Sequence, residues 1–213
     1  MQRVLLLGDS IRMFYQSKVE KILGEKYQIM APQENCRFSY YALNSLRFWL
    51  NDFEYPDIIH WNIGLWDLAI LYPEDGCFIS QENYVDNMKK ILRELKKTGA
   101  KIIFATTTPV WDEKKKMKGP FPPANRNEDI IAYNEAVLKA YSGEELEIND
   151  LHALIYEKRY IYIGSDMVHP NKEGIEVLGK AVADAIIRQG DYHNPSYRGG
   201  DKGAKKREEK TIQ

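Results

Sequence analysis

The sequence predicts an α/β protein, a three-layer αβα sandwich in which helices cover both faces of a central parallel sheet. Short apolar runs of strand length alternate with longer segments whose apolar residues recur at helical spacing. The chain has 213 residues, of which 44% are hydrophobic and 29% are charged, as in an ordinary globular protein with a sizeable core. We therefore expect one domain over residues 1–189.

Short apolar segments supply the strands of the predicted sheet. They are too short for helices, and glycine or proline closes most of them. The strand candidates are Arg3–Leu7, Tyr27–Ala31, Asp57–Ile63, Lys101–Thr107 and Leu146–Ile148. The run of β-branched residues in KIIFATT is especially typical of a strand.

Longer segments with apolar residues three or four positions apart supply the helices. The helix candidates are residues 12–23, 38–51, 81–98, 127–141 and Lys172–Arg188. The third of these has the clearest pattern, because Tyr84, Met88, Ile91 and Leu95 form one stripe and Gly99 marks the stop.

Composition excludes several classes of protein. A net charge of -1 gives no global field for nucleic acid or an anionic membrane, and no apolar stretch approaches the roughly 20 residues that span a bilayer. Cys36 and Cys77 lack metal-site spacing and suggest reduced thiols. The first strand starts too early to leave room for a signal peptide, so we expect a cytoplasmic protein unless a leader has been removed. Residues 190–213 lose apolar periodicity and are expected to form a flexible tail.

Ligands of open α/β sheets bind outside the carboxyl ends of the strands, so the residues after each strand are the ones to inspect. The first strand ends in Gly8-Asp9-Ser10, and the third ends in Asn62-Ile63-Gly64-Leu65-Trp66-Asp67. Asp166 and His169 occur together in GSDMVHPNKEG, just before the last helix. These segments contain the candidate catalytic and substrate-binding residues.

A serine hydroxyl becomes a nucleophile when an imidazole takes its proton and a carboxylate orients that imidazole. Ser10, His169 and Asp166 supply the three groups. Each piece alone has a structural alternative, because Gly-Asp-Ser also fits a capped helix start and Asp-x-x-His also fits a surface loop. Their joint placement at the first strand end and before the last helix favours a catalytic triad.

This joint arrangement resembles the SGNH hydrolase superfamily, also called the GDSL family of esterases and lipases. The resemblance extends from LLLGDS to SDMVHPNKEG and implies a flavodoxin-like sandwich with Ser10 as nucleophile and Asp166 and His169 as its partners. The family's third block is Gly-x-Asn-Asp. Gly64 and Asp67 match it here, but Trp66 stands at the asparagine position, and the stretch after the second strand lacks the family's glycine.

These departures affect the expected oxyanion hole, which in the family uses the serine amide, the second-block glycine amide and the third-block asparagine side chain. The Ser10 amide is retained. The amide of Cys36 or Arg37 is the expected substitute for the second donor. Asn62 and the Trp66 indole are alternatives for the third. Gly64 is expected to belong to the same oxyanion- and substrate-binding group.

The resemblance implies a serine esterase without metal or cofactor, acting on a small-molecule acyl ester, with O-acetyl groups on a carbohydrate as the first expectation. A lysophospholipid or another lipid ester is the alternative substrate. The other alternative is a member of the fold that binds its ligand without hydrolysing it. A nucleotide-binding protein of the same architecture is disfavoured, since no glycine-rich phosphate loop follows the first strand. The oligomeric state stays open. Residues 110–127 fit either a lid over the site or a solvated loop.

Overall fold

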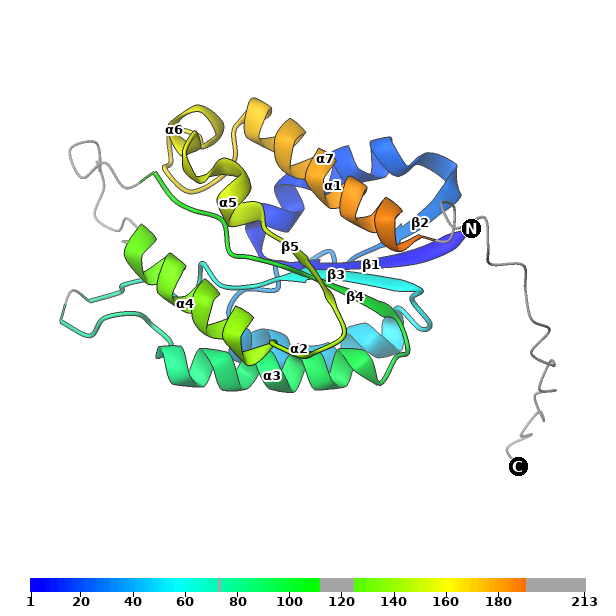
Figure 1. Cartoon of the computed structure of the whole chain (residues 1–213), viewed down its shortest axis with the longest axis horizontal. Helices are drawn as coiled ribbons and strands as arrows, with labels where there is room; N and C mark the ends of the chain where they lie inside the picture. The colour runs from blue at the N-terminus through cyan, green and yellow to red at the C-terminus, as the bar shows by residue number, and fades with distance from the viewer. Residues whose placement is uncertain (73, 112–124, 191–213) are drawn as a thin grey trace.

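The computed structural model describes residues 1–72, 74–111 and 125–190. Its centre is a five-stranded parallel sheet with the order β2-β1-β3-β4-β5 (Figure 1). The strands are β1 (Gln2–Gly8), β2 (Tyr27–Met30), β3 (Ile58–Asn62), β4 (Lys101–Ala105) and β5 (Glu147–Asn149). The strand order reverses between β1 and β3, and such a switch point is where open α/β sheets bind ligands.

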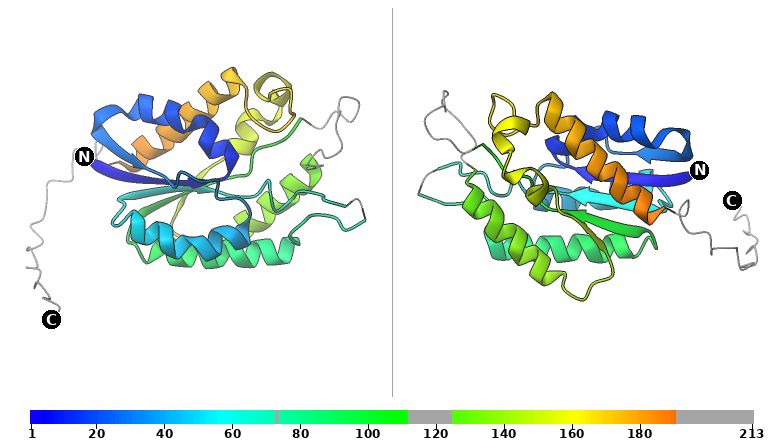
Figure 2. Two further views of the ribbon diagram at one scale, coloured as in Figure 1. Left: turned by 180° about the vertical axis from the view of Figure 1, so that it is seen from behind. Right: turned by 45° about the horizontal axis from the view of Figure 1, so that its top comes forward.

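Helices cover both faces of the sheet (Figure 2). One face carries α1 (Ser10–Leu23), α5 (Leu151–Tyr156), α6 (Arg159–Tyr162) and α7 (Lys172–Gln189), and the other carries α2 (Ser39–Asp52), α3 (Gln81–Lys96) and α4 (Asn127–Ala140). A short 3₁₀ helix, η1 (Gly24–Lys26), joins α1 to β2. Among the described helices, none is long and apolar enough to cross a membrane.

The two central strands are buried on both faces, which explains their unbroken apolar runs. Residues 4–7 of β1 and residues 58–61 of β3 have almost no exposed surface. His60 lies in this run with its Nε2 atom 3.2 Å from Asn149 Nδ2, and burial lowers its pKa to about 3. His60 is therefore a neutral core residue, as its apolar neighbours in the sequence suggest.

The register of the sheet aligns the ends of β1 and β3. Leu7 pairs with Trp61 and Gly8 with Asn62, so the loops that follow these strands leave the sheet side by side. This carboxyl edge lies on the left in Figure 1. Ser10 and the segment from Gly64 to Asp67 therefore begin at the same edge of the sheet.

The predicted fold class is confirmed, and every predicted strand and helix has a counterpart. Helix α1 begins at Ser10 rather than at residue 12, because the Asp9 side chain accepts from the Ile11 amide and caps it. Strand β4 ends at Ala105 rather than Thr107, because the Asn134 side chain bonds both backbone groups of Thr107. Strand β5 is one residue later than predicted. Helices α5 and α6 were not among the predicted elements, since six and four residues are too few to show a helical period.

Two sequence expectations fall mostly outside the described residues. The flexible tail expected over residues 190–213 begins where the description ends, at Gly190. Of the expected lid at 110–127, the structure describes residues 110–111 and 125–127. Both expectations stay predictions.

Candidate active site

Ser10 is the first residue of α1, directly after β1. The turn that delivers it is tight: a Cβ atom at Gly8 would lie 2.5 Å from the Arg12 Cβ atom. Asp9 holds the turn through its Oδ1 atom, which accepts from the Ile11 amide at 3.0 Å. The serine thus sits at a helix start, where backbone amides have no acceptor inside the helix.

The partner residues lie in the loop between α6 and α7. The loop closes on itself, because the Gly164 amide donates to the His169 carbonyl at 2.7 Å and the Met167 amide donates to the Gly164 carbonyl at 3.0 Å. Inside it, Asp166 Oδ1 accepts from the amides of Val168 and His169 at 3.0 and 2.9 Å. These two amides hold the Asp166 carboxylate in place independently of its contact with the imidazole.

A hydrogen-bond chain joins the three predicted residues. Asp166 Oδ2 lies 2.7 Å from His169 Nδ1, and His169 Nε2 lies 2.8 Å from Ser10 Oγ. Because a carboxylate only accepts, the Nδ1 atom carries the imidazole proton and Nε2 is left to accept from the serine. This is the arrangement in which an imidazole can take the serine proton.

The protonation of Asp166 agrees with this assignment. Partial burial raises the pKa of Asp166, but the two backbone amides and the imidazole outweigh it, so that the pKa lies below its usual range. The carboxylate is ionised at neutral pH and stabilises an imidazolium beside it.

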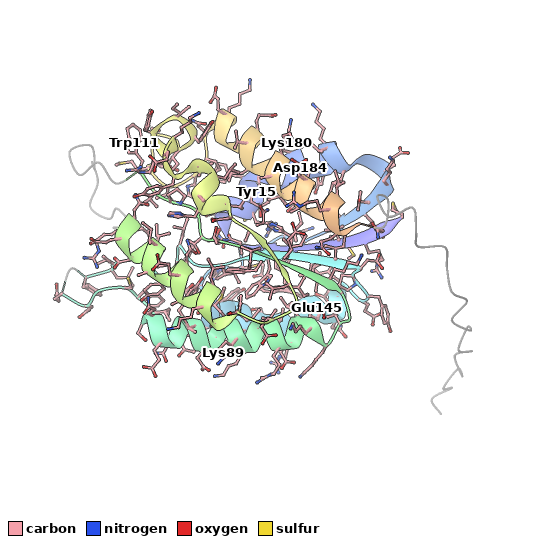
Figure 3. All side chains as sticks on the ribbon, viewed as in Figure 1. Tyr15, Lys89, Trp111, Glu145, Lys180 and Asp184 are labelled. Carbon is pink, nitrogen blue, oxygen red and sulfur yellow. The ribbon has the colours of Figure 1, made fainter. Side chains whose placement is uncertain are left out.

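The segment after β4 braces the histidine loop. The Trp111 amide donates to the Met167 carbonyl at 2.9 Å. Figure 3 shows Trp111 at the carboxyl edge of the sheet, close to α6. Met167 has a φ of 68°, in the left-handed region that non-glycine residues seldom occupy. This conformation lets the loop turn between Asp166 and His169.

The expected second oxyanion donor is engaged elsewhere. The Cys36 amide donates to the Gly8 carbonyl at 3.1 Å, and its Sγ atom lies 3.4 Å from the Gly8 nitrogen. The Arg37 amide donates to Asn35 Oδ1 at 2.7 Å. Neither amide is free in this structure to receive a substrate oxygen, because each already has an acceptor.

The structure separates the expected third-block residues. Asn62 is buried, and its Nδ2 atom lies 3.3 Å from the carbonyl oxygens of both Ala105 and Thr106, so it ties β3 to β4 rather than facing a ligand. A Cβ atom at Gly64 would overlap the Thr107 hydroxyl, which explains the glycine. Trp66 in contrast is 44% exposed. Of these three residues, Trp66 alone presents its side chain outward.

Asp67 and Asp9 are two buried carboxyls beneath the site. Both oxygens of Asp67 lie 3.0 Å from the Ser39 amide, which ties the loop after β3 to the start of α2. Burial raises the pKa of Asp67 to about 7 and that of Asp9 to about 6. Asp67 was recognised in the sequence as a family match, and here it organises the loop.

Sequence inspection missed Phe14. Its ring stacks on the His169 imidazole with centroids 4.8 Å apart and 18° between the planes. The signal was available, because residue 14 follows Ser10 by four positions on a helix and so lies on the same face.

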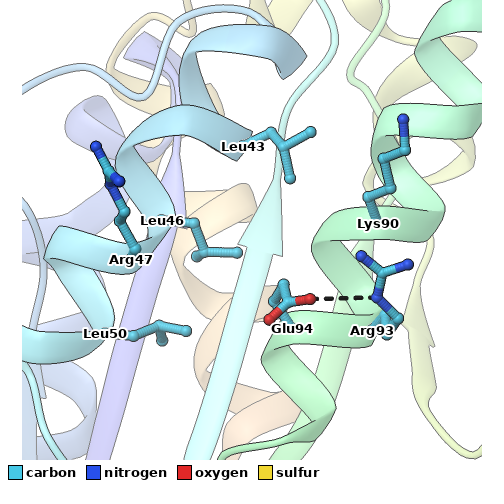
Figure 4. A pocket seen from close by; sticks show the side chains of 7 residues that line it. All are labelled: Leu43, Leu46, Arg47, Leu50, Lys90, Arg93 and Glu94. Atoms are coloured by element: carbon cyan, nitrogen blue, oxygen red, sulfur yellow. Dashed lines mark hydrogen bonds and ion pairs between the residues drawn. The ribbon is translucent and has the colours of Figure 1, made fainter.

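A separate groove of about 310 Å³ lies between α2 and α3 (Figure 4). Its lining consists of Leu43, Leu46, Arg47, Leu50, Lys90, Arg93 and Glu94. Arg93 and Glu94 form an ion pair at its edge. The groove contains none of the triad residues and is a distinct surface feature.

No family model and no curated protein matches the chain. Solved structures do share its fold. A lipase/acylhydrolase from Enterococcus faecalis has a TM-score of 0.72 at 16% identity, over 87% of this chain and 95% of that one. An acetyl xylan esterase, AlAXEase, has a TM-score of 0.68 at 17% identity, over 86% and 99%. A GDSL-like lipase from Bacteroides thetaiotaomicron has a TM-score of 0.63 at 16% identity, over 88% of each chain.

These likenesses define the class of fold as that of the GDSL-like lipases and acylhydrolases. More particularly, the chain has the SGNH hydrolase fold that its sequence blocks resemble. The predicted resemblance is thus confirmed at the level of the fold.

Proposed function

We propose that the protein is a serine esterase that hydrolyses small acyl esters through an acyl-enzyme. The observation that carries this proposal is the continuous chain from Asp166 through His169 to Ser10, with bonds of 2.7 and 2.8 Å. The base is in hydrogen-bond reach of both the nucleophile and the orienting carboxylate, as acyl transfer to serine needs.

In the first step, Ser10 Oγ attacks the carbonyl carbon of the ester while its proton passes to His169 Nε2. The carbonyl oxygen becomes an oxyanion, and the amide of Ser10 at the start of α1 is the proposed donor to it. The imidazolium, stabilised by Asp166, then gives the proton to the leaving alcohol as the ester bond breaks. In the second step, water attacks the acyl-serine with His169 as base, and the acid and the free Ser10 hydroxyl are released.

For the substrate, we propose an O-acetyl group on a carbohydrate. An acetyl xylan esterase is among the structures that share the fold. Two aromatic side chains at this edge of the sheet are exposed. Phe14 lies in α1, which follows β1, and Trp66 lies in the loop that follows β3. Aromatic faces suit sugar rings. A lipid acylhydrolase is the second candidate, since the E. faecalis neighbour is a lipase/acylhydrolase.

Hydrolysis of 4-nitrophenyl acetate and butyrate by the wild type and by Ser10→Ala tests the activity. We expect turnover by the wild type alone. Equal rates for the two proteins would refute Ser10 as nucleophile, and two inert proteins would contradict a small-ester activity.

Acetylated xylan oligosaccharides and lysophosphatidylcholine, offered to the same pair, then test the substrate. Release of acetate with no release of fatty acid is the expected result. The reverse outcome would replace the carbohydrate proposal with the lipid one.

A further inference from the structure

We propose that Phe14 is a positioning residue that holds the His169 imidazole during deacylation. The inference rests on the proposed function, since it assigns a role within the same reaction. Its basis is the stacked contact between the two rings, with centroids 4.8 Å apart and planes 18° from parallel. Phe14 touches the base rather than the reacting atoms.

The resting imidazole is held from three directions. Asp166 binds Nδ1, Ser10 binds Nε2, and Phe14 covers one face of the ring. The His169 side chain is 31% exposed and that of Asp166 is 54% exposed, so the pair is open to water. The ring is partly exposed, and each of the three contacts limits its rotation.

Acylation removes one of these contacts. Once Ser10 Oγ is bonded to the acyl carbon it carries no proton, so it no longer donates to Nε2. Deacylation then forms a bond from a water oxygen to the acyl carbon, while a water proton passes to Nε2. The bond from Ser10 Oγ to the acyl carbon breaks, and the proton passes from Nε2 to Oγ. During the attack by water, Asp166 and Phe14 are the two of these three contacts that remain. The Phe14 contact therefore has its largest effect in this step.

Phe14 does not contribute to the buried face of α1, so its position beside His169 is not explained by core packing. The buried face of α1 consists of Ile11, Arg12, Tyr15, Val19 and Leu23. Phe14 is 42% exposed, close to the 44% of its neighbour Met13. Replacing either side chain by leucine should therefore leave the fold intact, and Met13→Leu is a matched control for Phe14→Leu.

The test is pre-steady-state hydrolysis of 4-nitrophenyl acetate by the wild type, Phe14→Leu, Phe14→Tyr and Met13→Leu, with acylation and deacylation rates resolved. A stacked ring pair has a stabilising effect that corresponds to about three- to tenfold in rate. We expect Phe14→Leu to slow deacylation by this factor and acylation by less, so that acyl-enzyme accumulates. Phe14→Tyr, which keeps the ring, and Met13→Leu should follow the wild type.

Equal slowing of both steps, or no slowing, in Phe14→Leu would overturn the proposal while leaving the esterase intact. A wild type without esterase activity would instead refute the proposed function. In that case the proton NMR signal of His169 Nδ1–H, assigned by its loss in His169→Gln, still tests the positioning. A signal broadened in Phe14→Leu and unchanged in Met13→Leu supports it, and a signal unchanged in both refutes it.

Discussion

Asp166 holds His169 twice, through the backbone amide at 2.9 Å on Oδ1 and through imidazole Nδ1 at 2.7 Å on Oδ2. The first bond fixes where the histidine starts and the second fixes how its ring is turned. One short loop therefore supplies both the proposed base and the contacts that orient it.

Asp166→Asn should lower kcat by roughly 10³ to 10⁴ without unfolding the protein. The amide oxygen can still accept from the two backbone amides, but an NH₂ group facing Nδ1 favours the tautomer in which Nε2 carries the proton. Steady-state kinetics with 4-nitrophenyl acetate measure the loss, and the melting temperature serves as the control for folding. A variant with near wild-type kcat would show that Asp166 does not orient the base.

Trp66→Phe should lower kcat by about 10² with little change in KM, if the indole N–H is the oxyanion donor that replaces the family asparagine. The phenylalanine keeps an aromatic ring but removes the donor. Asn62→Ala is the contrasting variant: its bonds to the Ala105 and Thr106 carbonyls predict a loss of about 1–3 kcal/mol in unfolding free energy. Equal kcat for Trp66→Phe and the wild type would exclude the indole.

Gly64→Ala should destabilise the protein by about 1–3 kcal/mol, because the added methyl group overlaps the Thr107 hydroxyl. Thr107 cannot retreat easily, since its amide and carbonyl both bond to the Asn134 side chain at 2.9 Å. Urea unfolding of Gly64→Ala, Thr107→Ala and the double variant forms a double-mutant cycle. We expect the double variant to recover most of the loss; strict additivity of the two single effects would contradict the overlap.

Stability should fall between about pH 4 and pH 7 through Asp67. Burial raises the pKa of Asp67 to about 7 from 3.8 in an unfolded chain, so the folded state holds this proton more tightly. The contribution is complete below the lower value and is lost as pH rises through the higher one, on the order of 4 kcal/mol in all. Urea unfolding at pH 4.5 and 7.5 should show a smaller loss in Asp67→Asn than in the wild type, because the variant keeps only the loss that comes from Asp9.

Asp184→Asn is the control for this pH experiment. Asp184 pairs with Lys180 at 2.6 Å on the outer side of α7 (Figure 3), so this variant should follow the wild type at both pH values. A pH dependence of Asp67→Asn equal to that of the wild type would show that Asp67 is not the group responsible.

Most of the fold was predictable because the signals for it are local. The apolar runs of β1 and β3 and the stripe of α3 depend on neighbouring residues, and the serine, histidine and aspartate come from blocks whose spacing is visible in the sequence. The hydrogen-bond partners of the oxyanion candidates were not predictable. The Cys36 amide donates to the Gly8 carbonyl, and the Asn62 side chain donates to the carbonyl at the end of β4. Both hydrogen bonds join segments far apart in the sequence, so they follow only from the folded arrangement. The helical spacing of Phe14 from Ser10 was visible in the sequence, but its partner His169 lies near the other end of the chain, and only the fold brings the two rings together.

Helix α1 packs against α7, with Lys18 and Glu176 forming an ion pair between them. Ser10 and His169 meet across this contact, although they are 159 residues apart in the sequence. A chain that is still emerging from the ribosome therefore carries its proposed nucleophile almost from the outset, but the proposed base is not yet in place beside it. Reactivity toward esters would begin only when α7 packs against α1. The first hydrolysis of an ester would then show that folding is complete.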